Sequence, residues 1–176
     1  TLERMRIVHE GEYEILSGLY NRQAFHRVSE ELFRDPHQLG VAALLMMDLD
    51  NLKHINDTYG HDWGDQYIHR TGRCLAENTP NGTVVSRLSG DEFVLLLYGY
   101  SSQDQIREKI RILSSAMQKS VAILPSGNEL RISISGGVAW YPASGTDMDT
   151  LKKYADFGPL SGQAHQQGTS GRVQHG

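Results

Sequence analysis

The chain has 176 residues and a formal net charge of −4, a length that fits one domain better than two. The sequence contains no run of Lys and Arg that could contact a phosphate backbone, which argues against a protein that binds duplex nucleic acid. The single cysteine, Cys74, rules out an internal disulfide and favours a cytoplasmic location. The longest apolar run, residues 41–47, is far shorter than the roughly 20 residues of a membrane span, although a domain taken from a membrane-anchored protein would look the same. The start at Thr1, without a methionine, predicts such an origin.

The first half of the chain predicts helices around one buried strand. The near-continuous apolar run at residues 41–47 is typical of a strand that is covered on both faces. Apolar residues at helical spacing predict helices before and after it. These helices cover residues 2–15, 22–33 (capped by Asn21), 52–59 (ended by Gly60) and 65–77, and a loop over residues 60–64 separates the last two.

The second half predicts a hairpin, a helix, a strand and a final helix. Two β-rich runs, residues 84–88 and 93–98, flank a loop that contains glycine, which is the pattern of a β-hairpin. The order of all elements predicts an α/β (α+β) domain in which helices pack on a mixed sheet. The remaining elements are a helix from Ser101 or Ser102 to about residue 118, a strand at 131–140, a helix at 147–156 and a tail from Gly158 that is too polar to fold.

Carboxylates follow the buried strand and occupy the hairpin loop. Asp48 and Asp50 come directly after the strand, where open α/β sheets bind ligands. The alternative is that Asp50 or Asn51 only caps the next helix. Asp91, followed by Glu92, gives the hairpin loop more negative charge than a plain turn needs.

If the strand and the hairpin are neighbours, Asp48 and Asp91 approach each other. Two carboxylates 4 Å apart repel by about 1 kcal/mol in water and by about 4 kcal/mol at an effective dielectric constant of 20. A divalent cation removes this repulsion, and oxygen ligands favour Mg²⁺, Mn²⁺ or Ca²⁺ over zinc. Gly90, which has no side chain, lets phosphate oxygens approach the backbone amides. The two segments therefore predict a site for a metal ion and a nucleotide.

Polar residues after the strand offer further contacts to a nucleotide. Asn56 and Asp65 together match the donors and acceptor of a guanine edge. The alternative is a plain helix–loop–helix connection in which Asp65 caps the second helix. Lys53 is close enough in sequence to reach a phosphate, although a lone exposed lysine is more often only solvated. His61 lies in the predicted loop, where it could touch a ligand.

Four segments resemble, in order and spacing, the motifs of GGDEF domains. The match extends from about residue 14 to residue 157. The segments are residues 16–22 (L-S-G-L-Y-N-R), residues 47–65 (matching D-x-D-x-F-K-x-x-N-D-x-x-G-H-x-x-G-D), the signature S-G-D-E-F at residues 89–93 and residues 134–139 (I-S-G-G-V-A).

The resemblance implies a diguanylate cyclase, which condenses two GTP molecules into cyclic di-GMP and two pyrophosphates. It also implies a nucleotidyl-cyclase or palm-like fold with a ferredoxin-like core and a mostly antiparallel, five-stranded sheet. The domain limits are then a lead-in helix over residues 1–15, the catalytic domain over residues 16–157 and a divergent tail over residues 158–176. The expected partners are GTP, a second copy of the domain in an antiparallel homodimer, and an upstream sensory or membrane module.

The resemblance also assigns roles to residues. Asp48 and Asp91, helped by the Leu49 carbonyl, hold Mg²⁺, and Mn²⁺ is a second candidate. Asp91 or Glu92 helps to deprotonate the attacking hydroxyl, and Lys53 stabilises charge in the transition state. The nucleotide-binding set comprises Asn51, Leu52, Asn56, His61, Asp65, Ser89 and Gly90, with Asn56 and Asp65 reading guanine.

The sequence departs from the family pattern at three places. Ser89 replaces a glycine, at a cost of roughly 1–2 kcal/mol if that position needs a positive φ. Pro80 and Thr83 stand where the product-inhibition motif R-x-x-D has its two charges, so feedback inhibition at that site is not expected. The Lys and Arg that would hold the terminal phosphates are missing near residues 163–169. An alternative function is therefore a regulatory module that binds GTP with little or no turnover.

Overall fold

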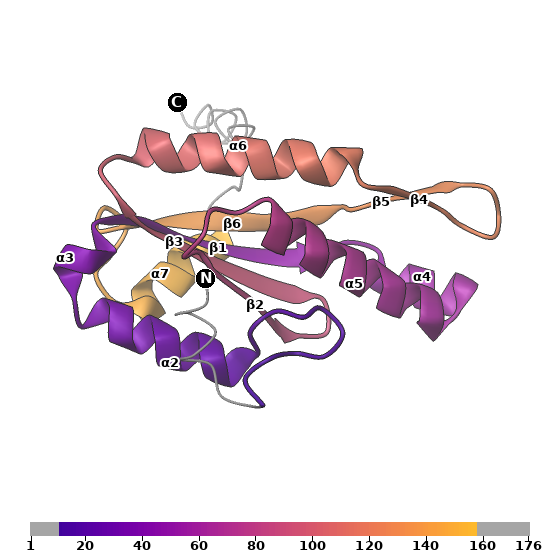
Figure 1. Cartoon of the computed structure of the whole chain (residues 1–176), viewed down its shortest axis with the longest axis horizontal. Helices are drawn as coiled ribbons and strands as arrows, with labels where there is room; N and C mark the ends of the chain where they lie inside the picture. Colours follow the sequence, from indigo (N-terminus) through magenta and orange to yellow (C-terminus); the bar gives the residue numbers. More distant parts are fainter. Residues whose placement is uncertain (1–10, 158–176) are drawn as a thin grey trace, which may run out of the picture.

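The computed structural model describes residues 11–157, which form an antiparallel sheet covered by helices on both faces (Figure 1). No helix in this part of the chain is long and apolar enough to cross a membrane. The elements in chain order are α2 (Arg22–Phe33), α3 (Pro36–Leu39), β1 (Val41–Leu49), α4 (Leu52–Tyr59), α5 (His61–Glu77), β2 (Val84–Ser89), β3 (Glu92–Tyr100), α6 (Gln103–Lys119), β4 (Val121–Ile123), β5 (Glu129–Arg131), β6 (Ile134–Tyr141) and α7 (Met148–Phe157).

The main sheet has the strand order β2-β3-β1-β6, and every neighbouring pair is antiparallel. The expected α/β (α+β) class is confirmed, but the expected count of five strands is wrong for the described residues, whose main sheet has 4 strands. On the free edge of β2, Tyr20 forms an isolated parallel bridge to Ser86. The strands β4 and β5 form a separate two-stranded hairpin.

Strand β1 is buried on both faces, as its apolar run predicts. Its odd-numbered residues from Ala43 to Leu49 face one core, and Ala42 and Leu44 face another, because successive side chains of a strand alternate. The first core is closed by α4, α5 and α6, and the second by α2, α3 and α7. Figure 1 shows α6 on one side of the sheet and α2 and α7 on the other. The strand therefore ends between two packed layers, with Asp48 already exposed.

The predicted lead-in helix is wrong for the residues that the structure describes. Residues 1–10 lie outside the described part, and residues 11–15 are not helical. Tyr13 forms an antiparallel bridge with Tyr20, and the Glu14 carboxylate accepts the N–H groups of Leu16 and Ser17 at 2.9 Å each. These bonds satisfy backbone N–H groups locally and so compete with the hydrogen bonds of a helix. The predicted tail over residues 158–176 also lies outside the described residues.

The predicted loop over residues 60–64 is also wrong, since α5 already begins at His61. Gly60, with φ of 95°, is both the C-cap of α4 and the N-cap of α5. A glycine adopts this positive φ at no steric cost, so one residue changes the chain direction. The acidic Asp62 then lies in the first turn of α5, where it interacts favourably with the helix dipole.

The single strand predicted at residues 131–140 is interrupted. Strand β5 ends at Arg131 and β6 begins at Ile134, because the backbone of Ser133 is bonded elsewhere. Its carbonyl accepts the Asp50 N–H at 2.8 Å, and its N–H donates to the Tyr67 hydroxyl at 3.1 Å. The cap predictions are confirmed: Asn21 accepts the Ala24 N–H, and the Ser102 hydroxyl accepts the N–H of residue 105.

Candidate functional site

The end of β1 and the loop between β2 and β3 lie side by side. Asp48 is the cross-strand partner of Glu92, and the Leu49 N–H donates to the Asp91 carbonyl at 2.8 Å. Asp48 and Asp91 are exposed, and Glu92 is partly buried. Residues directly opposite in an antiparallel pair have their Cβ atoms about 5 Å apart. Negative charge is thus concentrated where β1 leaves the sheet.

The hairpin loop takes its sharp turn at Gly90, whose φ is 40°. Arg87 braces this loop, since its Nε donates to the Gly90 carbonyl at 2.9 Å. Within residues 11–157, Asn51 is the only non-glycine residue with a positive φ, so Ser89 is not in the left-handed region. The free-energy cost that was expected if Ser89 had a positive φ therefore does not arise.

Asp50 and Asn51 do not cap the helix that follows them. The Asp50 carboxylate accepts the hydroxyl of Ser133 at 2.7 Å and the hydroxyl of Ser135 at 2.8 Å. Asn51 occupies the N-cap position of α4 but has φ of 66° and makes no side-chain cap bond. The capping alternative is therefore wrong for both residues, and the turn after β1 is held by Ser133, just before β6, and by Ser135 in β6.

The two residues predicted to read guanine belong to adjacent helices. The Asn56 side chain, on α4, lies against Gly64 of α5 so closely that a Cβ at Gly64 would collide with Asn56 Oδ1. Asp65 is exposed in the second turn of α5, so it does not cap that helix, contrary to the alternative. A groove of about 510 Å³ runs beside it, lined by Ile15, Leu16, Asp65, Gln66, His69, Arg70 and Arg73.

The other predicted nucleotide contacts lie at helix starts. Leu52 and the exposed Lys53 are the first two residues of α4, directly after the turn that follows β1. His61 is the exposed first residue of α5. Leu52 and Lys53 are therefore close in the chain to Asp48, and His61 lies beside the α4–α5 junction.

Residues 11–157 contain no group of three or more His, Cys, Asp and Glu side chains placed to hold a metal ion by themselves. The oxygen donors near the end of β1 include the carboxylates of Asp48, Asp91 and Glu92 and the backbone carbonyls. The Asp50 carboxylate is already engaged by the hydroxyls of two serines. Mg²⁺ is usually bound through one or two carboxylates together with water and substrate phosphates. The donor set thus fits a magnesium ion that arrives with a phosphate ligand better than a resident structural metal.

Tyr67 contributes to the site region in a way that the sequence did not predict. Its side chain is 1% exposed, and its hydroxyl donates to the Asp50 carbonyl at 3.0 Å. Burial raises the pKa of this hydroxyl, so the proton needed for that bond stays in place. The alternation of Ser133 and Ser135 with apolar residues indicates a polar strand face, but no spacing signal connects these serines or Tyr67 with Asp50.

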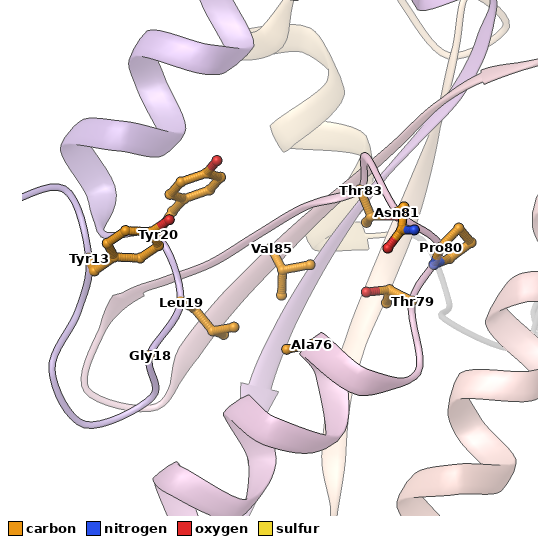
Figure 2. A pocket seen from close by; sticks show the side chains of 10 residues that line it. All are labelled: Tyr13, Gly18, Leu19, Tyr20, Ala76, Thr79, Pro80, Asn81, Thr83 and Val85. Atoms are coloured by element: carbon orange, nitrogen blue, oxygen red, sulfur yellow. The ribbon is translucent and has the colours of Figure 1, made fainter. Parts of the chain in front are cut away.

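A separate cavity of about 220 Å³ lies where the product-inhibition motif would be (Figure 2). Figure 2 shows Tyr13 and Tyr20 on one side and Thr79, Pro80, Asn81 and Thr83 on the other. The two tyrosine rings stack with centroids 5.5 Å apart and an interplanar angle of 16°. None of the lining residues is charged; they are Tyr13, Gly18, Leu19, Tyr20, Ala76, Thr79, Pro80, Asn81, Thr83 and Val85.

Comparisons with known proteins agree with the fold and the motifs. Residues 12–168 match the family model "Diguanylate cyclase, GGDEF domain". The solved GGDEF domain of TpbB or YfiN from Pseudomonas aeruginosa has 27% sequence identity and a TM-score of 0.74, covering 88% of this chain and 89% of that one. The chain belongs to the GGDEF domain family of diguanylate cyclases. The family match continues past Phe157, where the visible motif agreement ends.

Two curated relatives are themselves uncharacterized. YhcK of Bacillus subtilis (strain 168) is 34% identical over 151 residues, which cover 84% of this chain and 41% of that protein. A membrane protein of Staphylococcus aureus (strain USA300) is 31% identical over 170 residues, covering 95% of this chain and 46% of that protein. The chain thus spans less than half of either relative.

Proposed function

We propose that this domain is a diguanylate cyclase that condenses two GTP molecules into cyclic di-GMP and two pyrophosphates. The observation that carries the proposal is the meeting of β1 with the signature hairpin, where the Leu49 N–H bonds the Asp91 carbonyl and Asp48 faces Glu92. Family membership makes this reaction the first candidate for such a site. The proposed catalytic domain is residues 16–157.

Asp48 and Asp91, with the Leu49 carbonyl, are the proposed ligands of Mg²⁺ or Mn²⁺. When bound, the cation would neutralise phosphate charge and favour ionisation of the ribose 3′-hydroxyl. Asp91 or Glu92 accepts the proton of this hydroxyl as its oxygen attacks the α-phosphorus of the other GTP and pyrophosphate leaves. Lys53 balances negative charge that develops on the transferring phosphoryl group.

The guanine base is proposed to lie between α4 and α5. Asn56 and Asp65 supply complementary acceptors and a donor for its edge, and Gly64 leaves Asn56 the room to do so. Ser89 and Gly90 lie at the phosphates with Asn51 and Leu52, and His61 contacts the nucleotide from the start of α5. Each domain would hold one GTP, so the reaction needs an antiparallel pair of domains.

The direct test is incubation of the domain at high concentration with GTP and Mg²⁺, with chromatographic detection of cyclic di-GMP. Turnover should require Mg²⁺ or Mn²⁺ and should be lost in Asp91→Ala. The absence of product from a domain that is shown to be folded and dimeric would contradict the proposed activity.

The alternative of a GTP-binding regulatory module rests on the neutral residues near positions 163–169, where the family has cations for the terminal phosphates. Such a module would bind GTP in a magnesium-dependent manner without forming cyclic di-GMP. Calorimetry with GTP, run beside the turnover assay, separates the two functions. Further proposals concern the whole protein: its activity, its location in the cytoplasm and an upstream sensory or membrane module. Experiments on the full chain test them.

A further inference from the structure

The Tyr67 hydroxyl joins two elements that carry proposed site residues. Tyr67 lies on α5, two positions after Asp65, and its ring crosses the buried core to the end of β1. The hydroxyl donates to the Asp50 carbonyl at 3.0 Å and accepts the Ser133 N–H at 3.1 Å. A hydroxyl has one proton and two lone pairs, so it makes both bonds at once.

Asp50 is fixed on its other sides as well. Its N–H donates to the Ser133 carbonyl at 2.8 Å, and its carboxylate accepts the Ser133 and Ser135 hydroxyls at 2.7 and 2.8 Å. We call Asp50, Tyr67, Ser133 and Ser135 the Asp50 cluster. The cluster ties the first residue after β1 to α5 and to the start of β6.

The Asp50 cluster lies between the two halves of the proposed GTP site. Asp50 follows Asp48 by two residues and precedes Asn51, whose backbone is in the left-handed region. On the other side, Tyr67 lies on the same helix, α5, as Asp65. Side chains that engage a ligand must be held to within about 0.5 Å, and supporting hydrogen bonds provide this accuracy.

We propose that Tyr67 is a positioning residue that sets the distance between the phosphate half of the site, at Asp48 and Asp91, and the guanine half, at Asn56 and Asp65. This inference rests on the proposed function, because it takes GTP as the ligand that contacts both halves. When two halves are held in register, binding at one half raises the effective concentration of the ligand at the other. Removing the Tyr67 hydroxyl should weaken that coupling without damaging either half.

The test compares the unchanged domain with Tyr67→Phe, which keeps the ring and removes only the oxygen. Each protein is titrated by NMR, in the presence of Mg²⁺, with GTP, guanosine and inorganic tripolyphosphate. We expect Tyr67→Phe to bind GTP about tenfold more weakly. Its affinities for guanosine and tripolyphosphate, which each occupy one half, should stay unchanged.

Tyr59→Phe is the matched control, because Tyr59 on α4 makes a single hydroxyl contact of 3.0 Å, to Ser126 in the β4–β5 loop. It should bind all three ligands as the unchanged domain does. Ser133→Ala is a second variant, which removes a hydroxyl bond to Asp50 outside the core and should show a smaller loss for GTP alone.

Three results would overturn the inference. If Tyr67→Phe lowered the Tm but bound GTP normally, the hydroxyl would serve stability only. If it lowered the affinities for GTP, guanosine and tripolyphosphate equally, each half of the site would itself be damaged, and the distance between the halves would not be the cause. Either result leaves the proposed function intact, whereas failure of the unchanged domain to bind GTP removes the proposed function and the inference together.

Discussion

Glu14 and Arg87 form an ion pair in which Glu14 Oε1 lies 2.9 Å from Arg87 Nη1. The side chains are only 20% and 12% exposed, respectively. Arg87 also donates through Nε to the Gly90 carbonyl, and the Glu14 carboxylate accepts the N–H groups of Leu16 and Ser17. The pair therefore connects the turn at which the chain enters the domain with the loop of the signature hairpin.

This ion pair predicts a loss of stability in acid. Burial raises the pKa of Glu14, but the hydrogen bonds from Arg87 and from the turn outweigh it, so the pKa lies below its ordinary value of 4.5. A carboxylate with a lowered pKa in the folded state stabilises that state above about pH 4.5, and the contribution disappears as the pH falls through the folded-state pKa. Glu14→Gln should therefore lower the free energy of unfolding by about 1–2 kcal/mol at neutral pH.

Urea denaturation of both proteins between about pH 7 and pH 3 measures this difference. The two unfolding free energies should converge in acid. Glu108→Gln is the matched control, because Glu108 pairs with Arg111 on the exposed surface of α6 and should contribute little. A difference between Glu14→Gln and the unchanged domain that stayed constant across this pH range would contradict the assignment.

Gly64→Ala should impair nucleotide binding while leaving the fold intact. A methyl group at Gly64 would collide with Asn56 Oδ1, so the Asn56 side chain must turn away. The substitution also favours the helix by about 1 kcal/mol, because alanine has a higher helix propensity than glycine. We expect an unchanged or higher Tm together with a GTP affinity reduced about tenfold, measured by calorimetry.

The double variant with Asn56→Ala checks the cause. Gly64→Ala should weaken GTP binding no further once Asn56 is truncated, and an additive loss would contradict the proposed link. Gly136→Ala is a useful contrast, since its Cβ would meet the backbone of Met46 and Met47 in the neighbouring strand. Backbone in a sheet cannot turn away, so this variant should lose stability.

Local signals in the sequence predicted the main elements well. The apolar run of β1, the cap at Asn21 and the glycine-containing hairpin each depend on interactions within a few residues, and the structure confirms them. The interruption near Ser133 was missed, because its cause is the backbone hydrogen bond between Ser133 and Asp50, which lie 83 residues apart in the chain. The helix start at His61 was missed because Gly60 replaces a loop by one residue of positive φ.

The candidate site was predictable to the same extent. The acidic residues at the end of β1 and in the hairpin are visible in the sequence, and antiparallel pairing of β1 with β3 makes them neighbours. The hydrogen bonds that support these acidic residues could not be predicted from the sequence. Tyr67 looks like an ordinary core residue in the helical pattern, and only the packing of α5 on the sheet brings its hydroxyl to Asp50.

Asp48→Asn should stabilise the domain in the absence of divalent cations. Asp48 and Glu92 are direct cross-strand partners of like charge, an arrangement that costs roughly 0.2–1 kcal/mol. The amide removes this repulsion and replaces the proposed anionic metal ligand with a neutral oxygen, which binds Mg²⁺ far more weakly. Thermal unfolding in EDTA should give a slightly higher Tm than that of the unchanged domain, whereas added Mg²⁺ and GTP should no longer raise it.

Asp57→Asn, an exposed change on α4, is the control and should keep the normal response to Mg²⁺ and GTP. A full magnesium-dependent rise in Tm for Asp48→Asn would show that Asp48 is not a ligand. A lower Tm in EDTA would show that its carboxylate stabilises the metal-free site instead.

The cavity at Pro80 and Thr83 should not bind cyclic di-GMP tightly. Its lining is uncharged, so the two phosphates of the dinucleotide would lose water without gaining a charge-assisted hydrogen bond. Because the product can also occupy the proposed active site, calorimetry should be done in the presence of a saturating non-hydrolysable GTP analogue. No binding is expected under these conditions, and a Kd below about 1 µM would contradict the prediction. If that binding were then lost in Tyr13→Ala, the dinucleotide would be bound through base stacking on the exposed Tyr13 ring and not through ion pairs with its phosphates.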